Sequence, residues 1–126
     1  MENAPLPARR FKADLKERCF TFSMHVIRLV DTFPNKKSAH IIADQLIRSA
    51  TSVGANLTEA RASSSRREFK KFNEISLKSA NETRYWLDLA RNTDLAEKER
   101  IDMLLQEAGE LANMIAAGVI RLKNTI

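Results

Sequence analysis

Polar side chains recur along two stretches of this sequence at positions where helical periodicity predicts the interior. They are Arg48, Ser49, Ser52, Asn56 and Glu59, followed by Ser79 and Glu82. Such a set could line a ligand or catalytic pocket, or it could form an interhelical network of hydrogen bonds and ion pairs that fixes register and assembly. We favour the network, because no nucleophile or general base with an activating partner accompanies these residues. An arginine and a glutamate at this depth would need each other, since an unpaired buried charge is costly.

The densest positive charge of the chain lies between these two stretches. Five basic residues fall within eleven positions against a single acid, Glu68. They are Arg61, Arg66, Arg67, Lys70 and Lys71. At the start of a helix, where free backbone N–H groups also favour phosphate, this cluster predicts contact with the backbone of RNA or DNA and little sequence readout. Stacking on the bases of a single strand is not predicted, because Phe69 and Phe72 are expected to face the core.

The residue types and their spacing give little support for a metal site or for a catalytic nucleophile. His25 and His40 do not form the Glu-x-x-His pairs of di-iron bundles, and no other cluster has the spacing of metal ligands. The sequence has no Gly-x-Ser-x-Gly and no glycine-rich phosphate loop. Cys19 lies on an apolar stripe and is expected to be a buried structural thiol. We therefore expect no metal, no cofactor and no enzymatic activity.

A metal-independent ribonuclease is a further alternative. Arg18 and His25 are seven residues apart and so share one face of a helix. The histidine could act as general acid and base while the arginine stabilises charge on phosphate. Some helical-bundle ribonucleases use such a pair, but it is not expected in the first helix, so this two-residue match ranks below the other hypotheses.

Composition and charge indicate a single helical domain. The chain has 126 residues with three glycines and three prolines, too few for the turns of an all-β fold, and it is rich in strong helix formers. The formal net charge is +5; residues 1–91 hold 17 Lys and Arg against 10 Asp and Glu, and residues 92–126 hold 4 against 6. A basic body is compatible with a polyanion as partner, although many solvated helical proteins reach this charge without one.

The compartment follows from what the sequence lacks. A single cysteine excludes an intramolecular disulfide and fits a reducing compartment. The first ten residues lack the apolar region of a signal peptide, and no run approaches the roughly 20 apolar residues of a spanning helix. We expect a soluble cytoplasmic protein with no membrane partner.

The apolar pattern divides the chain into four helices joined by short polar turns. Residues 1–9, with Pro5 and Pro7, are expected to form a flexible arm before a bundle domain at 10–126. Helices are predicted at residues 10–32, 38–60, 66–92 and 96–123. Because short turns make sequential neighbours antiparallel, the predicted fold is all-α, an antiparallel up-down-up-down four-helix bundle.

Capping residues mark the expected starts of the last three helices. Ser38 is the predicted N-cap of the second helix. Ser65 and Glu68 form a capping box for the third. Thr93 or Asp94 is the predicted cap of the fourth.

Small residues and a wide apolar face give two packing expectations. Gly54 lies beside a seam of small residues, where a neighbouring backbone can approach closely. The last helix carries a second apolar stripe, which suggests either burial against another subunit or a broad core-facing side. This stripe comprises Leu105, Ala112, Ala116 and Val119.

The stretch 41–87 resembles a known family. The residues that carry the resemblance are Ile47-Arg48-Ser49-x-x-Ser52-x-x-x-Asn56-Leu57-x-Glu59-Ala60, then Ser64-x-x-x-Glu68-Phe69, then Phe72-x-x-x-Ser76-x-x-Ser79-x-x-Glu82. They are similar to the four-helix bundle proteins encoded by intervening sequences within bacterial 23S rRNA genes. That family is similar in turn to the accessory variability proteins of diversity-generating retroelements. The match covers residues 10–123, by periodicity alone in the first and last helices. Ala60 stands where glycine is frequent and Leu57 where isoleucine is usual, and neither changes the expected fold.

The resemblance implies a homopentameric barrel of four-helix bundles, with a basic surface that binds RNA or DNA without strong sequence preference. In the retroelement branch the protein is the partner of a reverse transcriptase, and the motifs fit both branches. The resulting hypothesis is a non-enzymatic, oligomeric, nucleic-acid-binding accessory protein. Its rival is a structural or protein-binding bundle whose basic residues only confer solubility.

Overall fold

Four long helices make up the described part of the chain. The computed structural model describes residues 8–124, with side chains described for residues 15–122. The helices are α1 (Ala8–Val30), α2 (Lys37–Ala62), α3 (Arg66–Asn92) and α4 (Lys98–Asn124), which confirms the predicted all-α fold. Of the predicted arm at 1–9, residues 1–7 lie outside the described residues, and the last two belong to α1.

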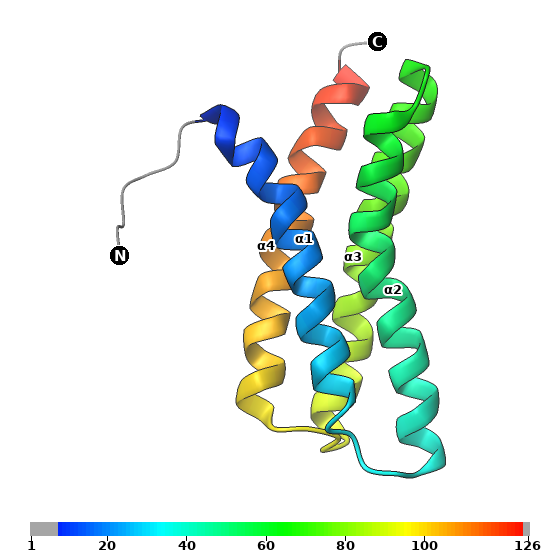
Figure 1. Cartoon of the computed structure of the whole chain (residues 1–126), viewed down its shortest axis with the longest axis vertical. Helices are drawn as coiled ribbons and strands as arrows, with labels where there is room; N and C mark the ends of the chain where they lie inside the picture. The colour runs from blue at the N-terminus through cyan, green and yellow to red at the C-terminus, as the bar shows by residue number, and fades with distance from the viewer. Residues whose placement is uncertain (1–7, 125–126) are drawn as a thin grey trace.

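The helices form a bundle in which each is antiparallel to the next. Within residues 8–124, the backbone of α2 lies close to α1 and α3, and that of α4 lies close to α3 and α1, whereas the backbones of the diagonal pairs do not approach this closely. Figure 1 shows the α1–α2 and α3–α4 connections at one end of the bundle and the α2–α3 connection at the other. This order is the predicted up-down-up-down topology. None of the helices within this range is long and apolar enough to cross a lipid bilayer.

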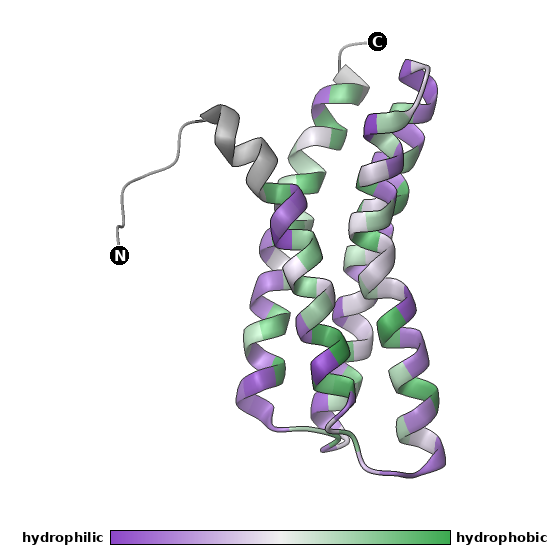
Figure 2. Cartoon of the chain, in the orientation of Figure 1, coloured by the Kyte–Doolittle hydropathy of each residue, from purple (hydrophilic) through white to green (hydrophobic). Residues whose placement is uncertain are grey.

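The core is built from the apolar stripes of all four helices. Figure 2 shows hydrophobic and hydrophilic colours alternating along the helices. The largest fully buried side chains of the core include Phe22, Val26, Leu29, Leu46, Val53, Leu87, Ile101 and Leu111. Cys19 is fully buried, as predicted, and burial raises the pKa of its thiol to about 11. On α4, Ala112 and Val119 of the second stripe are buried within the chain's own bundle. Leu105 packs against the same core, and Ala116 is half-buried, so the chain's own bundle covers most of that stripe.

The start of α2 differs from the sequence prediction. The helix begins at Lys37, with Lys36 as N-cap and no side-chain capping bond, so the prediction of Ser38 as N-cap is wrong. The turn after Pro34 already places Lys36 in extended backbone, with φ −151° and ψ 159°. The Lys36 carbonyl then accepts a helical hydrogen bond from His40 N at 3.0 Å, and the helix starts before Ser38 is reached.

One predicted cap is confirmed at α3 and another is wrong at α4. Ser65 Oγ accepts a hydrogen bond from Glu68 N at 3.1 Å, which confirms Ser65 as the N-cap of α3. The return bond of the predicted capping box lies one residue earlier, because Glu68 Oε1 accepts from Ser64 N at 3.3 Å and not from Ser65 N. Thr93 is the C-cap of α3 rather than the N-cap of α4. Asp94 follows it in the left-handed region, with φ 58°. Thr93 and Asp94 therefore belong to the turn that ends α3, and α4 begins at Lys98, two residues later than predicted.

Gly54 lies where α2 packs against α1. A Cβ atom placed on Gly54 would lie 3.2 Å from the Cβ of Cys19, which is closer than ordinary van der Waals contact. The Cys19 Cβ is fixed to the backbone of α1 and cannot rotate away. The prediction that Gly54 permits close approach of a neighbouring helix is confirmed.

Two glycine substitutions test this contact against each other. Gly109→Ala is expected to raise the free energy of unfolding by about 1 kcal/mol, because alanine is the better helix former and a Cβ there meets nothing within 4 Å. Gly54→Ala brings the same gain in helix propensity but must displace α1, so we expect it to be at least about 1 kcal/mol less stable than Gly109→Ala. Urea unfolding measures both. Equal stabilisation by the two substitutions would contradict the close contact.

Candidate nucleic-acid interface

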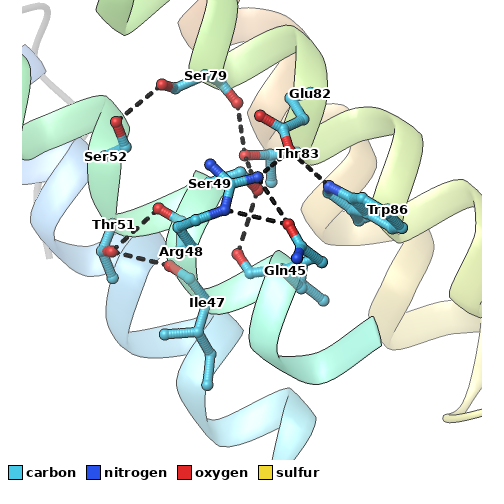
Figure 3. Close-up of polar contacts among 11 residues, drawn as sticks. Gln45, Ile47, Arg48, Ser49, Thr51, Ser52, Ser79, Glu82, Thr83 and Trp86 are labelled. Carbon is cyan, nitrogen blue, oxygen red and sulfur yellow. Dashed lines mark hydrogen bonds and ion pairs between the residues drawn. The ribbon is translucent and has the colours of Figure 1, made fainter. Parts of the chain in front are cut away.

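A ladder of hydroxyl groups joins α2 to α3. Thr83 Oγ1 donates to Ser49 Oγ at 3.0 Å, and Ser79 Oγ donates to Ser52 Oγ at 2.8 Å (Figure 3). Ser76 Oγ donates to a backbone carbonyl of α2 at 2.7 Å. Ser49, Ser76 and Thr83 are fully buried, and these bonds satisfy hydroxyl groups that would otherwise be costly to desolvate. The structure thus places Ser49, Ser52 and Ser79 in an interhelical hydrogen-bond network.

Asn56 belongs to this hydrogen-bond ladder, whereas Glu59 does not. Asn56 Nδ2 donates to the hydroxyl and to the carbonyl of Ser52, each at 2.8 Å, so Asn56 extends the ladder along α2. Glu59 is exposed, and no hydrogen bond of the network among the described residues reaches it. Including Glu59 in the network is therefore wrong. The residue that turns inward here is the next one, the buried Ala60.

A half-exposed ion pair continues the network at the surface. Arg48 Nη2 pairs with Glu82 Oε2, and Arg48 also donates to Gln45 Oε1 from Nε at 3.1 Å and from Nη2 at 2.9 Å. Trp86 Nε1 donates to the same Glu82 oxygen at 2.8 Å (Figure 3). The side chains of Arg48 and Glu82 are 54% and 37% exposed, so the expected burial of this pair is wrong: long stems carry both charges to the solvent. The Trp86 hydrogen bond, followed by the contacts with Arg48, holds the pKa of Glu82 below its usual value.

The lowered pKa of Glu82 gives a pH-dependent prediction. A carboxylate whose pKa is lowered by folding stabilises the protein above its unfolded pKa, and this contribution is lost as the pH falls through the folded pKa. Glu82→Gln is expected to lower the free energy of unfolding near neutral pH by less than about 1 kcal/mol, because solvent screens the pair. At a pH below the folded pKa of Glu82, the difference from the wild type should shrink towards zero.

Denaturant unfolding at the two pH values measures this difference. Glu59→Gln is the matched control, because it removes an exposed charge outside the network. A loss of stability in Glu82→Gln that is the same at both pH values would show that the charge of Glu82 is not the cause.

The catalytic candidates are not brought together. Arg18 binds Glu107 through Nε at 3.0 Å and Nη2 at 2.8 Å, and its Nη2 also binds Glu110 at 2.7 Å. The hydrogen bond to Glu107 raises the pKa of Arg18, and Arg18 in turn lowers the pKa of Glu110. His25 is exposed and makes no hydrogen bond to Arg18 within the described range. The guanidinium that the ribonuclease hypothesis requires is thus bound to α4. The described residues also include no group of three or more His, Cys, Asp or Glu that could hold a metal ion.

The five residues predicted to bind phosphate lie together at the α2–α3 end of the bundle. Arg61 lies in the last turn of α2, and the others occupy the first two turns of α3. We call this set the basic turn: Arg61, Arg66, Arg67, Lys70 and Lys71. All are exposed except Lys70, which is half-buried. Figure 2 shows strongly hydrophilic colour at this end of α2 and α3. The basic turn concentrates positive charge beside the N-terminus of α3.

A cavity of about 420 Å³ opens beside the basic turn, and we call it the end cavity. All four helices contribute to its apolar wall, for example through Leu15, Leu57, Phe69 and Ile115. Phe69 is 36% exposed, so the prediction that it faces the core is wrong, whereas Phe72 is half-buried. The polar side chains that line the cavity are Arg61, Arg66, Asn73 and Arg121.

A second hollow of about 880 Å³ lies between α1 and α2, and we call it the α1–α2 groove. Phe20 and Ile27 line it from α1 and are 68% and 41% exposed. Gly54 and Ala55 line it from α2. Large exposed apolar side chains beside small ones form a surface against which another helix can pack.

Comparisons with known proteins agree with this architecture. The family described as 23S rRNA-intervening sequence protein matches residues 12–117. A crystal structure of a protein with unknown function from the S23 ribosomal protein family of Bacteroides thetaiotaomicron VPI-5482 has 30% sequence identity and a TM-score of 0.78, over 83% of this chain and 97% of that one. No curated protein matches the chain. The relation to the accessory proteins of retroelements stays a prediction. The chain belongs to the 23S rRNA-intervening sequence protein family.

Proposed function

We propose that the protein is a non-enzymatic, oligomeric accessory protein that binds RNA or DNA through the basic turn. The observation that carries this proposal is the gathering of five basic side chains at one end of the bundle, four of them exposed. Lys and Arg side chains neutralise phosphates and release counterions, so such a cluster supplies affinity without base-specific contacts.

Three further features support a polyanionic partner. α3 begins within the basic turn, so its first backbone N–H groups and the positive end of its dipole add to the field. The one acid of this segment, Glu68, uses a carboxylate oxygen to accept a hydrogen bond from Ser64 N. The names of the family and of its structural relative refer to rRNA and to a ribosomal protein family, in line with an RNA partner.

The oligomer of the proposal is a homopentamer, as the family resemblance implies. The α1–α2 groove supports assembly between copies of this chain, because Phe20 and Ile27 expose apolar surface there. A ring repeats the basic turn in every subunit, so weak phosphate contacts gain by avidity. In the retroelement branch the assisted protein would be a reverse transcriptase, and a gene for one beside this gene would identify it.

A salt titration tests the proposal directly. Fluorescence anisotropy with short labelled RNA and DNA is expected to show affinity falling steeply as salt rises, because bound phosphates release counterions. The nucleic acid should stay intact throughout. Affinity that is unchanged between low and physiological salt would rule out binding through the basic turn.

A further inference from the structure

We propose that the end cavity receives an unstacked base of single-stranded RNA or DNA while the basic turn holds the neighbouring phosphates. This inference rests on the proposed function and adds the form of nucleic acid that the site selects. The sequence alone predicts no stacking, since it places Phe69 in the core. The structure instead places Phe69 in the wall of a cavity that also contains arginine side chains.

The end cavity has the size and lining of a site for a small planar group. Its volume of about 420 Å³ lies within the range of roughly 300–1,000 Å³ that is typical of ligand pockets. Leu57, Met114 and Ile115 supply apolar wall, and Phe69 supplies an aromatic ring that is not fully covered. Every base has an apolar face that can stack on an aromatic side chain, so this contact would tolerate any sequence.

Polar groups in the same cavity match the rest of a nucleotide. Arg61, Arg66 and Arg121 line it, and guanidinium groups bind phosphate oxygens and stack on planar rings. Asn73 donates one amide hydrogen to the carbonyl of Phe69 at 2.7 Å. A side-chain amide keeps a second N–H and an acceptor oxygen, which are groups that can pair with the edge of a base. A planar group joined to an anion fits this lining better than a purely apolar ligand or a free anion does.

Base insertion and backbone binding predict opposite preferences. Contacts with phosphates alone favour a duplex, which carries the denser charge. A base can enter the end cavity from a single strand at little cost, but a duplex must first unpair and unstack it. We therefore expect the single strand to bind more tightly than the duplex. The expected ratio is roughly 5- to 150-fold, which corresponds to the stacking of one base.

The experiment compares three probes on the full chain by anisotropy at one salt concentration. The first probe is a short single strand. The second is an abasic strand of the same length, which keeps the sugars and phosphates but carries no bases. The third is the duplex that contains the first strand. Gly118→Leu fills the end cavity: Gly118 lines it, and a Cβ there meets only a guanidinium nitrogen of Arg121, at 3.9 Å. Gly109→Leu is the matched control on the same helix, since a Cβ there meets nothing within 4 Å. Phe69→Ala removes the aromatic ring.

Base insertion predicts that the intact single strand binds more tightly than both the abasic strand and the duplex. It also predicts that Gly118→Leu and Phe69→Ala lose this preference while keeping duplex binding, and that Gly109→Leu keeps it. Equal affinity for the three probes, or a preference that survives Gly118→Leu, would overturn the inference and leave the proposed function standing. Absence of binding to any probe would overturn both.

Discussion

Replacing all five side chains of the basic turn by glutamine is expected to remove most RNA and DNA binding at physiological salt. Glutamine keeps hydrogen-bonding capacity but removes the charges that displace counterions. Log affinity falls as log salt rises, and each lost phosphate contact makes this slope less steep by about 0.9 for a duplex and about 0.7 for a single strand. Five lost contacts therefore reduce this slope by roughly 3.5 to 4.5 and the affinity by on the order of 10³-fold.

A second variant with the same change in net charge separates local contacts from the overall field. It replaces five exposed basic residues outside the basic turn by glutamine: Arg28, Lys36, Lys37, Arg84 and Arg100. We expect this control to lose far less affinity. Thermal unfolding of both variants is needed, because Arg61 and Arg66 also interact within the chain. Equal losses in the two variants would mean that net charge, and not the basic turn, attracts the nucleic acid.

The same pair of variants addresses the rival hypothesis of a structural or protein-binding bundle. If the basic residues only confer solubility, the wild type binds RNA and DNA weakly and neither variant changes this binding. If the basic turn is a phosphate site, only its own variant loses affinity. The ribonuclease hypothesis requires cleavage that depends on His25. It would need a guanidinium other than that of Arg18, which two carboxylates of α4 hold.

The fold could be predicted because it depends on signals that are local in sequence. Apolar stripes with a period of three and four residues gave the four helices, and the Ser65–Glu68 spacing gave the start of α3. Ser38 and Thr93 show the limit of such signals, because backbone turns compete with capping side chains for the same peptide groups. At α2 the turn after Pro34 places Lys36 as the N-cap, so the helix has already begun when the chain reaches Ser38. At α4 the left-handed Asp94 delays the start of the helix.

The candidate site could be predicted only in part, because its features depend on how distant residues meet. The spacing of the serines on α2 and α3 was sufficient to predict an interhelical network, but helical periodicity does not reveal that Arg48 and Glu82 reach the solvent. The sequence does not reveal that Arg18 pairs with α4, although Glu107 and Glu110, three residues apart, share one helix face. The end cavity has no sequence signal at all, since its wall is assembled from residues of four helices that are far apart in the sequence.

Phe20→Glu is expected to convert the proposed homo-oligomer into monomers. Phe20 is 68% exposed on α1, so its replacement should not unfold the bundle. In the assembled protein the same position would lie in the α1–α2 groove against a second copy, where an unpaired carboxylate is costly to bury. Loss of the ring also removes avidity, so we expect the affinity for a nucleic acid long enough to span several subunits to fall by roughly 10²- to 10⁴-fold.

Met103→Glu is the matched control for this substitution. Met103 is 73% exposed on α4, so the variant makes the same apolar-to-acidic change at a comparable exposure but outside the α1–α2 groove. Multi-angle light scattering gives the mass of each variant, and anisotropy with short and long strands separates avidity from intrinsic affinity. A wild type that is monomeric would contradict the assembly itself. An oligomer that survives Phe20→Glu but dissociates in Met103→Glu would move the interface from α1 and α2 to α4. Dissociation of Phe20→Glu alone, with short-strand affinity preserved, would identify the α1–α2 groove as the contact that arranges the basic turns around one ring.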